Sequence, residues 1–409
     1  MIFKCVNCGA EYPVLAENYL CPTCSKKNDA KLPPRGVFKT VYNYQKIQTL
    51  TQEDLFTYLE EHNFLPLLPV KKYQSFSPLQ VGNTPLYHYS LPNGIEFFLK
   101  DDSQNPTYSY KDRASNLVSA FAKENGITTI TTASTGNAGS SLAGICASQN
   151  QKAIIFVPAS APKAKLTQIV MYGATIVPVD ANYDSCFELS ISASKKFGWY
   201  NRNTAYNPLT IEGKKTSSFE IYAQMQRHVP DFVFVPVGDG VIISGIYRGF
   251  EDLLLLGIIK KMPTIVAVQS SGSSNLINNL KTSKPVFATS NTIADSISVD
   301  VPRNFYMTKK FLEKYDGLGI VVDDTEILKA SMKLSKQFGL FTEPASAAAF
   351  AGYVKFKEMA KLVNKEMVVV QLTGSGLKDL DSIKKLCEIP TPIKPNLLEL
   401  DNFLKKRKI

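Results

Sequence analysis

The chain has 409 residues, 44% of them hydrophobic and 11% aromatic, which is enough apolar material for two domain cores and a small additional module. Its formal net charge of +10 comes from basic residues that are spread along the chain and balanced locally by acids, so we expect no nucleic-acid partner. No segment approaches the ~18 to 20 uncharged apolar residues of a membrane helix, and no secretory apolar core precedes the first cysteines. We therefore expect a cytoplasmic protein with no membrane partner.

Four of the seven cysteines cluster at the N-terminus in the pattern CxxC-x12-CxxC. These are Cys5, Cys8, Cys21 and Cys24. A gap of two residues lets both thiolates of a pair reach one tetrahedral metal ion, so the spacing predicts a structural Zn²⁺ with no position open for a substrate. Two disulfides, or a ribbon that has lost its metal, are the alternatives. We expect the other three to be buried thiols: Cys146, Cys186 and Cys387.

Between the cysteine cluster and residue 81 the signals are weaker. Lys31–Arg35 contains two prolines and indicates a stiff linker, and a helix is predicted near Gln52–Glu61. Farther on, Lys111 lies between turn-forming residues and the start of an apolar-periodic helix, in the run Asn105–Arg113. By itself this run fits a surface lysine as well as a chemically special one.

From residue 81 onward, short apolar runs alternate with helical segments. Most of the runs are continuously apolar, as expected of strands buried on both faces of a parallel sheet, so we predict an α/β fold. The predicted strands are Ile127–Thr132, Ala153–Val157, Thr175–Val179, Phe232–Val237, Thr264–Gln269 and Met367–Leu372. In such sheets ligands gather at the carboxyl ends of the strands, where this chain has several turns rich in glycine, serine or threonine.

The first of these turns precedes a helix of small residues, Ser140–Ser148. Hydroxyls and backbone N–H groups at this helix start form an anion site of carboxylate size, and the asparagine can donate to a phenolate-like oxygen. The candidate residues are Ser134, Thr135, Gly136, Asn137 and Ala138. A plain capped turn with small residues for close packing is the alternative.

The second turn joins the strand Phe232–Val237 to a helical pattern that runs from Ile243 to Phe250. Its glycines allow the backbone amides to surround a phosphate, and the helix start adds positive potential. The candidate residues are Gly238, Asp239, Gly240, Val241 and Ile242.

Two further segments follow. Thr373–Asp379 comes directly after the last predicted strand, and Phe341–Ala348 is interpreted as the start of a helix with Thr342 as its cap and Pro344 in its first turn.

In type, order and position, these segments resemble those of pyridoxal-phosphate (PLP) enzymes of the tryptophan-synthase-β type, and within that group those of the threonine synthases. The resemblance covers about residues 81 to 380 and rests on Lys111, the turn after residue 133, the turn after residue 237 and the segment Thr373–Asp379. It implies that PLP is the cofactor, that Lys111 bonds covalently to it and acts as the catalytic base, and that the enzyme is a carbon–oxygen lyase.

The resemblance also assigns binding roles. Ser134 to Ala138 would hold the substrate α-carboxylate, and Asn137 would also bond to the cofactor's ring oxygen. Gly238 to Ile242 would cradle the cofactor phosphate, and Thr373 would face the pyridine nitrogen, which a neutral hydroxyl leaves uncharged.

Three positions depart from the threonine synthase pattern. Asp239 stands where these enzymes usually have asparagine, Thr210 where an arginine is expected, and Ala205 where a serine is expected. The last two affect the grip on the phosphate of O-phosphohomoserine, the threonine synthase substrate. Basic residues nearby could replace them as point charges, and the candidates are Lys214, Lys215 and Arg202.

Three functions therefore stay open. The first is threonine synthase with a rebuilt phosphate pocket. The second is a homologue acting on another amino acid, by β-replacement as in cysteate or diaminopropionate synthesis, by deamination or by carbon–carbon cleavage. The third is a non-catalytic zinc-ribbon adaptor, against which the retention of Lys111 argues.

The resemblance implies two doubly wound α/β domains with the cofactor between them. We expect a zinc ribbon at residues 1–34, a large PLP-binding domain from residues 35–101 and 201–409, and a small α/β domain at residues 102–200. A homodimer is a family expectation, and a small amino acid is the expected substrate.

Overall fold

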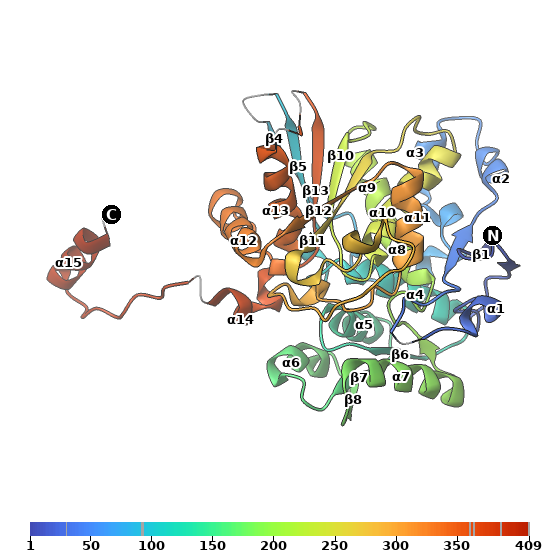
Figure 1. The fold of residues 1–409 in the computed structure, drawn as a ribbon, viewed down its shortest axis with the longest axis horizontal. Helices are drawn as coiled ribbons and strands as arrows, with labels where there is room; N and C mark the ends of the chain where they lie inside the picture. Colours follow the sequence, from blue (N-terminus) through green and yellow to red (C-terminus); the bar gives the residue numbers. More distant parts are fainter. Residues whose placement is uncertain (30, 91–93, 360, 363–364, 385–386, 408–409) are drawn as a thin grey trace.

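The computed structural model describes residues 1–29, 31–90, 94–359, 361–362, 365–384 and 387–407 (Figure 1). The expected large domain ends at residue 409, and this last position lies outside the described residues. The described strands form three sheets of three, six and four strands.

The N-terminal sheet is antiparallel and has the strand order β2-β1-β3. Its strands are β1 (Ile2–Cys5), β2 (Glu11–Tyr12) and β3 (Phe38–Val41), and one short helix, α1 (Pro22–Ser25), lies between the second and third. The following arm contains α2 (Tyr44–Gln48), α3 (Leu55–Glu61), η1 (Leu65–Leu67) and η2 (Tyr73–Ser75). Figure 1 shows this N-terminal part, in blue, on the side of the molecule where α11 lies.

The six-stranded sheet has the order β12-β11-β10-β13-β5-β4, and only β4 runs antiparallel to its neighbour. Its strands are β4 (Leu86–Ser90), β5 (Glu96–Asp101), β10 (Phe232–Pro236), β11 (Thr264–Ser270), β12 (Leu318–Val322) and β13 (Met367–Leu372). Helices cover both faces, because the central strands are apolar on both sides. These helices are α8 (Leu209–Lys214), α9 (Thr216–Gln224), α10 (Val241–Leu255), α11 (Phe305–Lys314), α12 (Asp324–Phe338) and α13 (Pro344–Glu358).

The four-stranded sheet is parallel throughout, in the order β8-β7-β6-β9. Its strands are β6 (Thr129–Ala133), β7 (Lys152–Pro158), β8 (Thr175–Val179) and β9 (Tyr200–Asn201), and its helices are α4 (Lys111–Glu124), α5 (Asn137–Ser148), α6 (Lys163–Met171) and α7 (Tyr183–Phe197). Short 3-10 turns are η3 (Asp102–Gln104), η4 (Ser271–Ser273), η5 (Ile277–Asn279), η6 (Asp295–Ile297) and η7 (Gly376–Lys378). Beyond α14 (Leu380–Ile383), the chain leads to α15 (Leu397–Arg407), which lies away from the rest of the molecule (Figure 1).

All six predicted strands are present within two residues of their expected ends, which confirms the α/β prediction. Of these strands, β6, β7 and β8 lie in the four-stranded sheet and β10, β11 and β13 in the six-stranded sheet, and the domain division stays a prediction. Two local predictions are wrong. Cys387 is exposed rather than buried, because it follows the last sheet strand in a segment with little packed against it. The cap of α13 is Glu343 rather than Thr342, and its side chain makes no capping bond.

Within the described residues, no helix combines the length and the apolar composition needed to cross a bilayer.

Candidate active site

One cavity of about 1480 Å³ gathers most of the predicted site residues. Its wall includes Lys111, residues 133–138 after β6 and residues 236–243 after β10. These turns come from different sheets and meet because each follows the carboxyl end of a parallel strand. The wall also includes residues of the N-terminal ribbon, which the sequence did not predict.

Lys111 opens α4 and is held in place by the residue before it. The Tyr110 N–H donates to the Thr373 carbonyl at 2.9 Å, and the Tyr110 hydroxyl donates to the Lys214 carbonyl at 2.8 Å. Asp112, just after the lysine, accepts from the Thr107 N–H at 2.7 Å and so closes the preceding turn. The lysine therefore projects from a backbone that is fixed on both sides.

The Lys111 amine has no hydrogen-bond or ion-pair partner among the described residues. Burial lowers the pKa of Lys111, while the nearby Glu343 carboxylate opposes this shift. A lowered pKa raises the fraction of neutral amine, which is the form that attacks an aldehyde and accepts a proton.

The turn after β6 offers free donors at the start of α5. The Gly136 N–H donates to the Ser134 hydroxyl at 3.2 Å, which curls the turn, whereas the N–H groups of Thr135, Asn137 and Ala138 have no partner among the described residues. Together with the helix start, such donors suit a carboxylate.

Asn137 is paired differently from the sequence expectation. Its side-chain amide donates to both carboxylate oxygens of Glu343 at 3.0 Å and to the Ser296 hydroxyl at 3.2 Å. Burial raises the pKa of Glu343, and the Asn137 bond lowers it in part. By sequence alone the Phe341–Ala348 segment fits a capped helix start, and this interpretation gave Glu343 too little weight as a site residue. It missed Ser296 altogether, since an isolated loop serine carries no pattern.

The turn after β10 has the form of a phosphate cradle. Gly240 has φ +86°, and a Cβ there would lie 2.3 Å from the Thr308 hydroxyl, so only glycine fits. The N–H groups of Gly240, Val241 and Ile242 have no partner among the described residues. Free amides at the start of the long helix α10 suit an anion.

Asp239, the acidic departure in this turn, is tied to the residues before α11. One of its carboxylate oxygens accepts from the Arg303 N–H at 3.0 Å, and its carbonyl accepts from the Asn304 N–H at 2.9 Å. The side chain still lies in the cavity wall. Its negative charge is partly offset by this bond, and the free amides of the turn remain available.

Thr373 is buried beside Lys111 but is not part of the cavity wall as the structure describes it. Its N–H donates to the Ser346 hydroxyl at 2.8 Å, and its carbonyl accepts from Tyr110. Its own hydroxyl has no partner among the described residues. The predicted role toward the cofactor ring stays a prediction.

These residues fit the expected cofactor. An unpaired amine at Lys111 suits the aldehyde of PLP, and the unpaired amides from Gly240 to Ile242 suit its phosphate. The unpaired hydroxyl of Thr373 suits a neutral ring nitrogen.

The three basic candidates for a second anion site have different environments. Lys215 is engaged elsewhere, with Glu212 at 2.6 Å and Asp252 at 2.7 Å. Lys214 lies in the cavity wall with a fully buried side chain, and its ammonium has no partner. Burial lowers its pKa well below the usual value, and Arg202 and Lys111 add to the shift.

Arg202 is also buried, but unlike Lys214 it is not among the residues that line the cavity, although Tyr200 and Thr204 on either side of it are. One guanidinium nitrogen donates to the Thr204 hydroxyl at 2.9 Å, while Nη2 has no partner. Burial lowers the pKa of Arg202 to about 10, so this side chain stays charged at neutral pH. Two buried and incompletely paired cations leave room for a strong anion.

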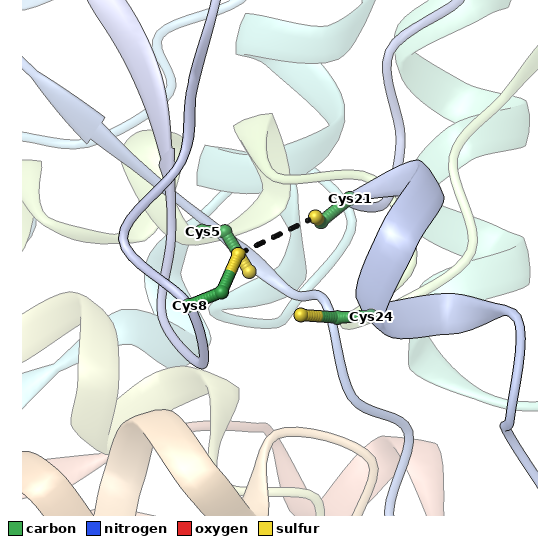
Figure 2. A group of neighbouring side chains, drawn as sticks. All are labelled: Cys5, Cys8, Cys21 and Cys24. Carbon is green, nitrogen blue, oxygen red and sulfur yellow. Dashed lines mark hydrogen bonds between the residues drawn. The ribbon is translucent and has the colours of Figure 1, made fainter.

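The cysteine cluster closes around one point in the N-terminal ribbon (Figure 2). The four sulfurs all lie within 4.8 Å of one another, and those of Cys8 and Cys21 are 3.8 Å apart. Four thiolates bound to one tetrahedral Zn²⁺ at about 2.3 Å would be separated by roughly 3.8 Å. All four are free cysteines in the structure, so the arrangement fits a metal better than two disulfides.

Comparison with known proteins adds an independent line of information. The model of the family described as "Pyridoxal-phosphate dependent enzyme" matches residues 78–374. Threonine synthase from Methanocaldococcus jannaschii is 32% identical over 416 residues, which cover 99% of this chain and 100% of the relative. Threonine synthase from a Bacillus species is 35% identical over 320 residues, which cover 77% of this chain and 88% of the relative.

Solved structures match the fold. Threonine deaminase isoform 2 from Solanum lycopersicum aligns with a TM-score of 0.68 and 22% identity, over 88% of this chain and 97% of that one. Diaminopropionate ammonia lyase from Escherichia coli aligns with a TM-score of 0.64 and 17% identity, over 77% and 89% of the two chains. At these identities the matches establish the fold, and they confirm the fold-class prediction.

Proposed function

The chain belongs to the pyridoxal-phosphate dependent enzymes, and from this premise we propose that it is a threonine synthase, which converts O-phosphohomoserine and water to threonine and phosphate. Membership of this family makes it a PLP-dependent lyase of amino-acid metabolism and argues against a non-catalytic adaptor. The choice of substrate is supported by one observation above all. Lys214 and Arg202 are buried basic side chains, each with one terminal nitrogen that has no partner among the described residues, and Lys214 shares the cavity of Lys111.

Each group of the proposed substrate has a matching site. The α-carboxylate would lie on the free amides of Thr135, Asn137 and Ala138, at the start of α5. The phosphate, a dianion at neutral pH, would pair with Lys214 and Arg202, which would offset the cost of burying two cations. This pair would stand in for the arginine that the family pattern expects at Thr210 and the serine expected at Ala205.

The bound cofactor would supply an electron sink for the negative charge that develops at the substrate α-carbon. Lys111 would anchor it, Gly238 to Ile242 would hold its phosphate, and Asn137 and Thr373 would meet its ring. The Lys111 amine would take the α-proton, and the burial that lowers its pKa favours the neutral form needed for this step. As the phosphate leaves the γ-carbon, Lys214 and Arg202 would stabilise the charge that grows on its oxygens.

The same proposal extends to the rest of the protein. Cys5, Cys8, Cys21 and Cys24 would bind one structural Zn²⁺. The domain division given above would place the cofactor between a small and a large domain, and the enzyme would act in the cytoplasm, with a homodimer as its assembly.

The test measures phosphate release by the PLP-loaded protein from O-phosphohomoserine, beside O-phosphoserine and threonine. We expect release from the first, with threonine formed in equal amount. A protein that is inactive with O-phosphohomoserine but turns over O-phosphoserine or threonine would instead be a homologue that carries out β-replacement or deamination.

A further inference from the structure

The N-terminal ribbon contributes part of the wall of the cavity that holds Lys111. Tyr19 and Leu20, just before Cys21, line it, and so do Asn28 and Asp29, just after Cys24. The second cysteine pair is thus flanked on both sides by residues of the cavity wall. This position raises the question of what the ribbon does for the site.

On one side the ribbon holds the segment that carries Arg202. The Tyr19 hydroxyl accepts from the Asn201 N–H at 2.9 Å, and the Tyr19 ring stacks on Tyr206 with centroids 4.6 Å apart and planes at 15°. Asn201 belongs to β9, an edge strand of the four-stranded sheet, so this bond satisfies a backbone donor that the sheet leaves unpaired. Arg202 follows directly in the chain.

On the other side the ribbon contacts α11. Lys310 donates to the carbonyl of Val6, in the first cysteine pair, and the Arg35 guanidinium lies 5.7 Å from the centre of the Tyr306 ring.

The start of α11 in turn holds the glycine turn. The Asn304 side chain donates to the Gly240 carbonyl at 3.2 Å, and the Thr308 hydroxyl donates to the same carbonyl at 3.0 Å. The ribbon therefore touches both sides of the cavity, the Arg202 segment through Tyr19 and the glycine turn through α11.

We propose that Tyr19 is a positioning residue, through which the metal-closed ribbon braces the Arg202 segment against the glycine turn across the cavity. The anion-binding role of Arg202 rests on the proposed function, whereas the brace itself rests only on these contacts. The ribbon strands have two to four residues each, too few to hold their shape without a cross-link. Metal at Cys21, two residues after Tyr19, would fix the backbone from which the tyrosine projects.

The chain contains a built-in reporter of this brace. Its one tryptophan, Trp199, lines the cavity next to Tyr200, whose ring centre is 5.8 Å from that of Tyr19. Emission from Trp199 will respond to movement of the ribbon whether or not the protein turns over any substrate.

The experiment compares wild type, Tyr19→Phe and Tyr19→Ala in the PLP-loaded, metal-loaded protein, with Tyr73→Ala as a matched control on an exposed tyrosine elsewhere. A chelator should shift the Trp199 emission of wild type and of Tyr73→Ala, and should shift that of Tyr19→Ala much less, because the ring contact is already lost. Tyr19→Phe keeps the stacked ring and should shift nearly as wild type.

Kinetics supply a second measurement. Tyr19→Ala should raise KM for O-phosphohomoserine and the inhibition constant of inorganic phosphate by about tenfold, which corresponds to ~1.4 kcal/mol, with kcat within about twofold. Tyr19→Phe should raise both by about threefold, through the lost hydrogen bond.

Two results would overturn the proposal. One is an equal chelator-induced shift in wild type and Tyr19→Ala, and the other is a fall in kcat with KM unchanged. If O-phosphohomoserine is not a substrate, the emission comparison still decides on the brace, so its failure is distinguishable from that of the proposed function.

Discussion

At the scale of single residues, the cavity is defined by side chains whose charge is not matched locally. In the part of the chain that the structure describes, the Lys111 amine is unpaired and the buried Lys214 amine has no partner. Glu343 bonds to Asn137, which lies 206 positions away in the chain. The sequence predicted the role of Lys111 only through the family resemblance, because the run around it fits a surface lysine equally well. It could not decide the role of Glu343, because the acid's partner comes from a distant segment and the local pattern fits an ordinary helix start.

Replacing Lys111 by alanine should remove the covalent attachment of PLP and lower kcat by about 10³-fold, because anchor and base are lost together. The measurements are the visible absorbance of the PLP-loaded protein and phosphate release. Lys111→Arg should lose covalent PLP attachment and phosphate release to the same extent, since a guanidinium keeps the positive charge but neither bonds to the aldehyde nor accepts the proton. Lys163→Ala, at an exposed lysine at the start of α6, should behave as wild type, and a Lys111→Ala variant that kept the bound chromophore would contradict the assignment.

Replacing Lys214 by methionine should stabilise the ligand-free protein by about 1 to 3 kcal/mol at pH 7, because a buried amine without a partner among the described residues is removed. The sign follows from the lowered pKa of Lys214. The native state binds fewer protons here than the unfolded state, so wild-type stability rises with pH toward the usual value of 10.5. The advantage of the variant should shrink between pH 7 and pH 9 in thermal unfolding.

The adjacent change, Lys215→Met, is the matched control. It should destabilise the protein by about 3 to 5 kcal/mol, because Glu212 and Asp252 would lose a buried partner. Titration with inorganic phosphate should show binding to wild type and none to Lys214→Met. A loss of stability in Lys214→Met would show that its ammonium is satisfied after all.

At the scale of elements, β6, β7, β8, β10, β11 and β13 were predictable, whereas β4, β5, β9 and β12 were not. The predicted strands are continuous apolar runs, whereas β5 ends in Lys100 and Asp101, both of which are fully buried. Lys100 is tolerated there because its amine donates to Glu220, on α9, at 2.7 Å. A pattern along the chain cannot reveal such pairing. The strand β9 has only two residues, which are too few for a periodic signal.

The turn between β10 and α10 gives a prediction at this scale. Gly240→Ala should weaken PLP binding at least about tenfold, because the new methyl group would strain a positive φ and push Thr308 away from the cradle. Gly257→Ala imposes a similar backbone strain at φ +74° with nothing within 4 Å, outside the cavity. It should cost stability but leave PLP affinity unchanged in a fluorescence titration. Equal PLP affinities in the two variants would refute the cradle.

At the scale of the whole molecule, the N-terminal sheet is attached to helices α8 and α10 through β3 and the residue after it. The Thr40 carbonyl accepts from Arg248 at 2.9 Å, and the Tyr42 hydroxyl, just beyond β3, donates to Glu212 at 2.8 Å. Arg248 in turn pairs with Glu251 and Asp252. The sequence predicted the ribbon from its cysteine spacing, but it left open whether the ribbon meets the active site. That contact depends on single side chains from distant elements.

At this scale we predict that the four N-terminal cysteines bind one zinc ion. Metal analysis should find about one zinc per chain, and the double variant Cys5→Ser, Cys8→Ser should lose it. Because β3 is anchored separately, the rest of the protein should stay folded. Compared with wild type, the double variant should show faster hydrogen exchange in residues 1–34 and little change elsewhere. Cys146→Ser, at a buried cysteine outside the cluster, should retain the zinc. Full zinc content in the double variant would disprove the assigned ligands.

Lys214 and Lys215 are neighbours in the chain but differ in role, since one lies in the cavity wall and the other belongs to the scaffold. Lys215 forms ion pairs with two buried carboxylates. Lys214 lies in the cavity wall, and its amine has no partner among the described residues. If Lys214 binds the substrate anion as proposed, related proteins can exchange the side chain at position 214, and with it the anion, without losing the contacts that hold the fold together. Position 214 can therefore change as substrate preference evolves, whereas position 215, in the next codon, cannot.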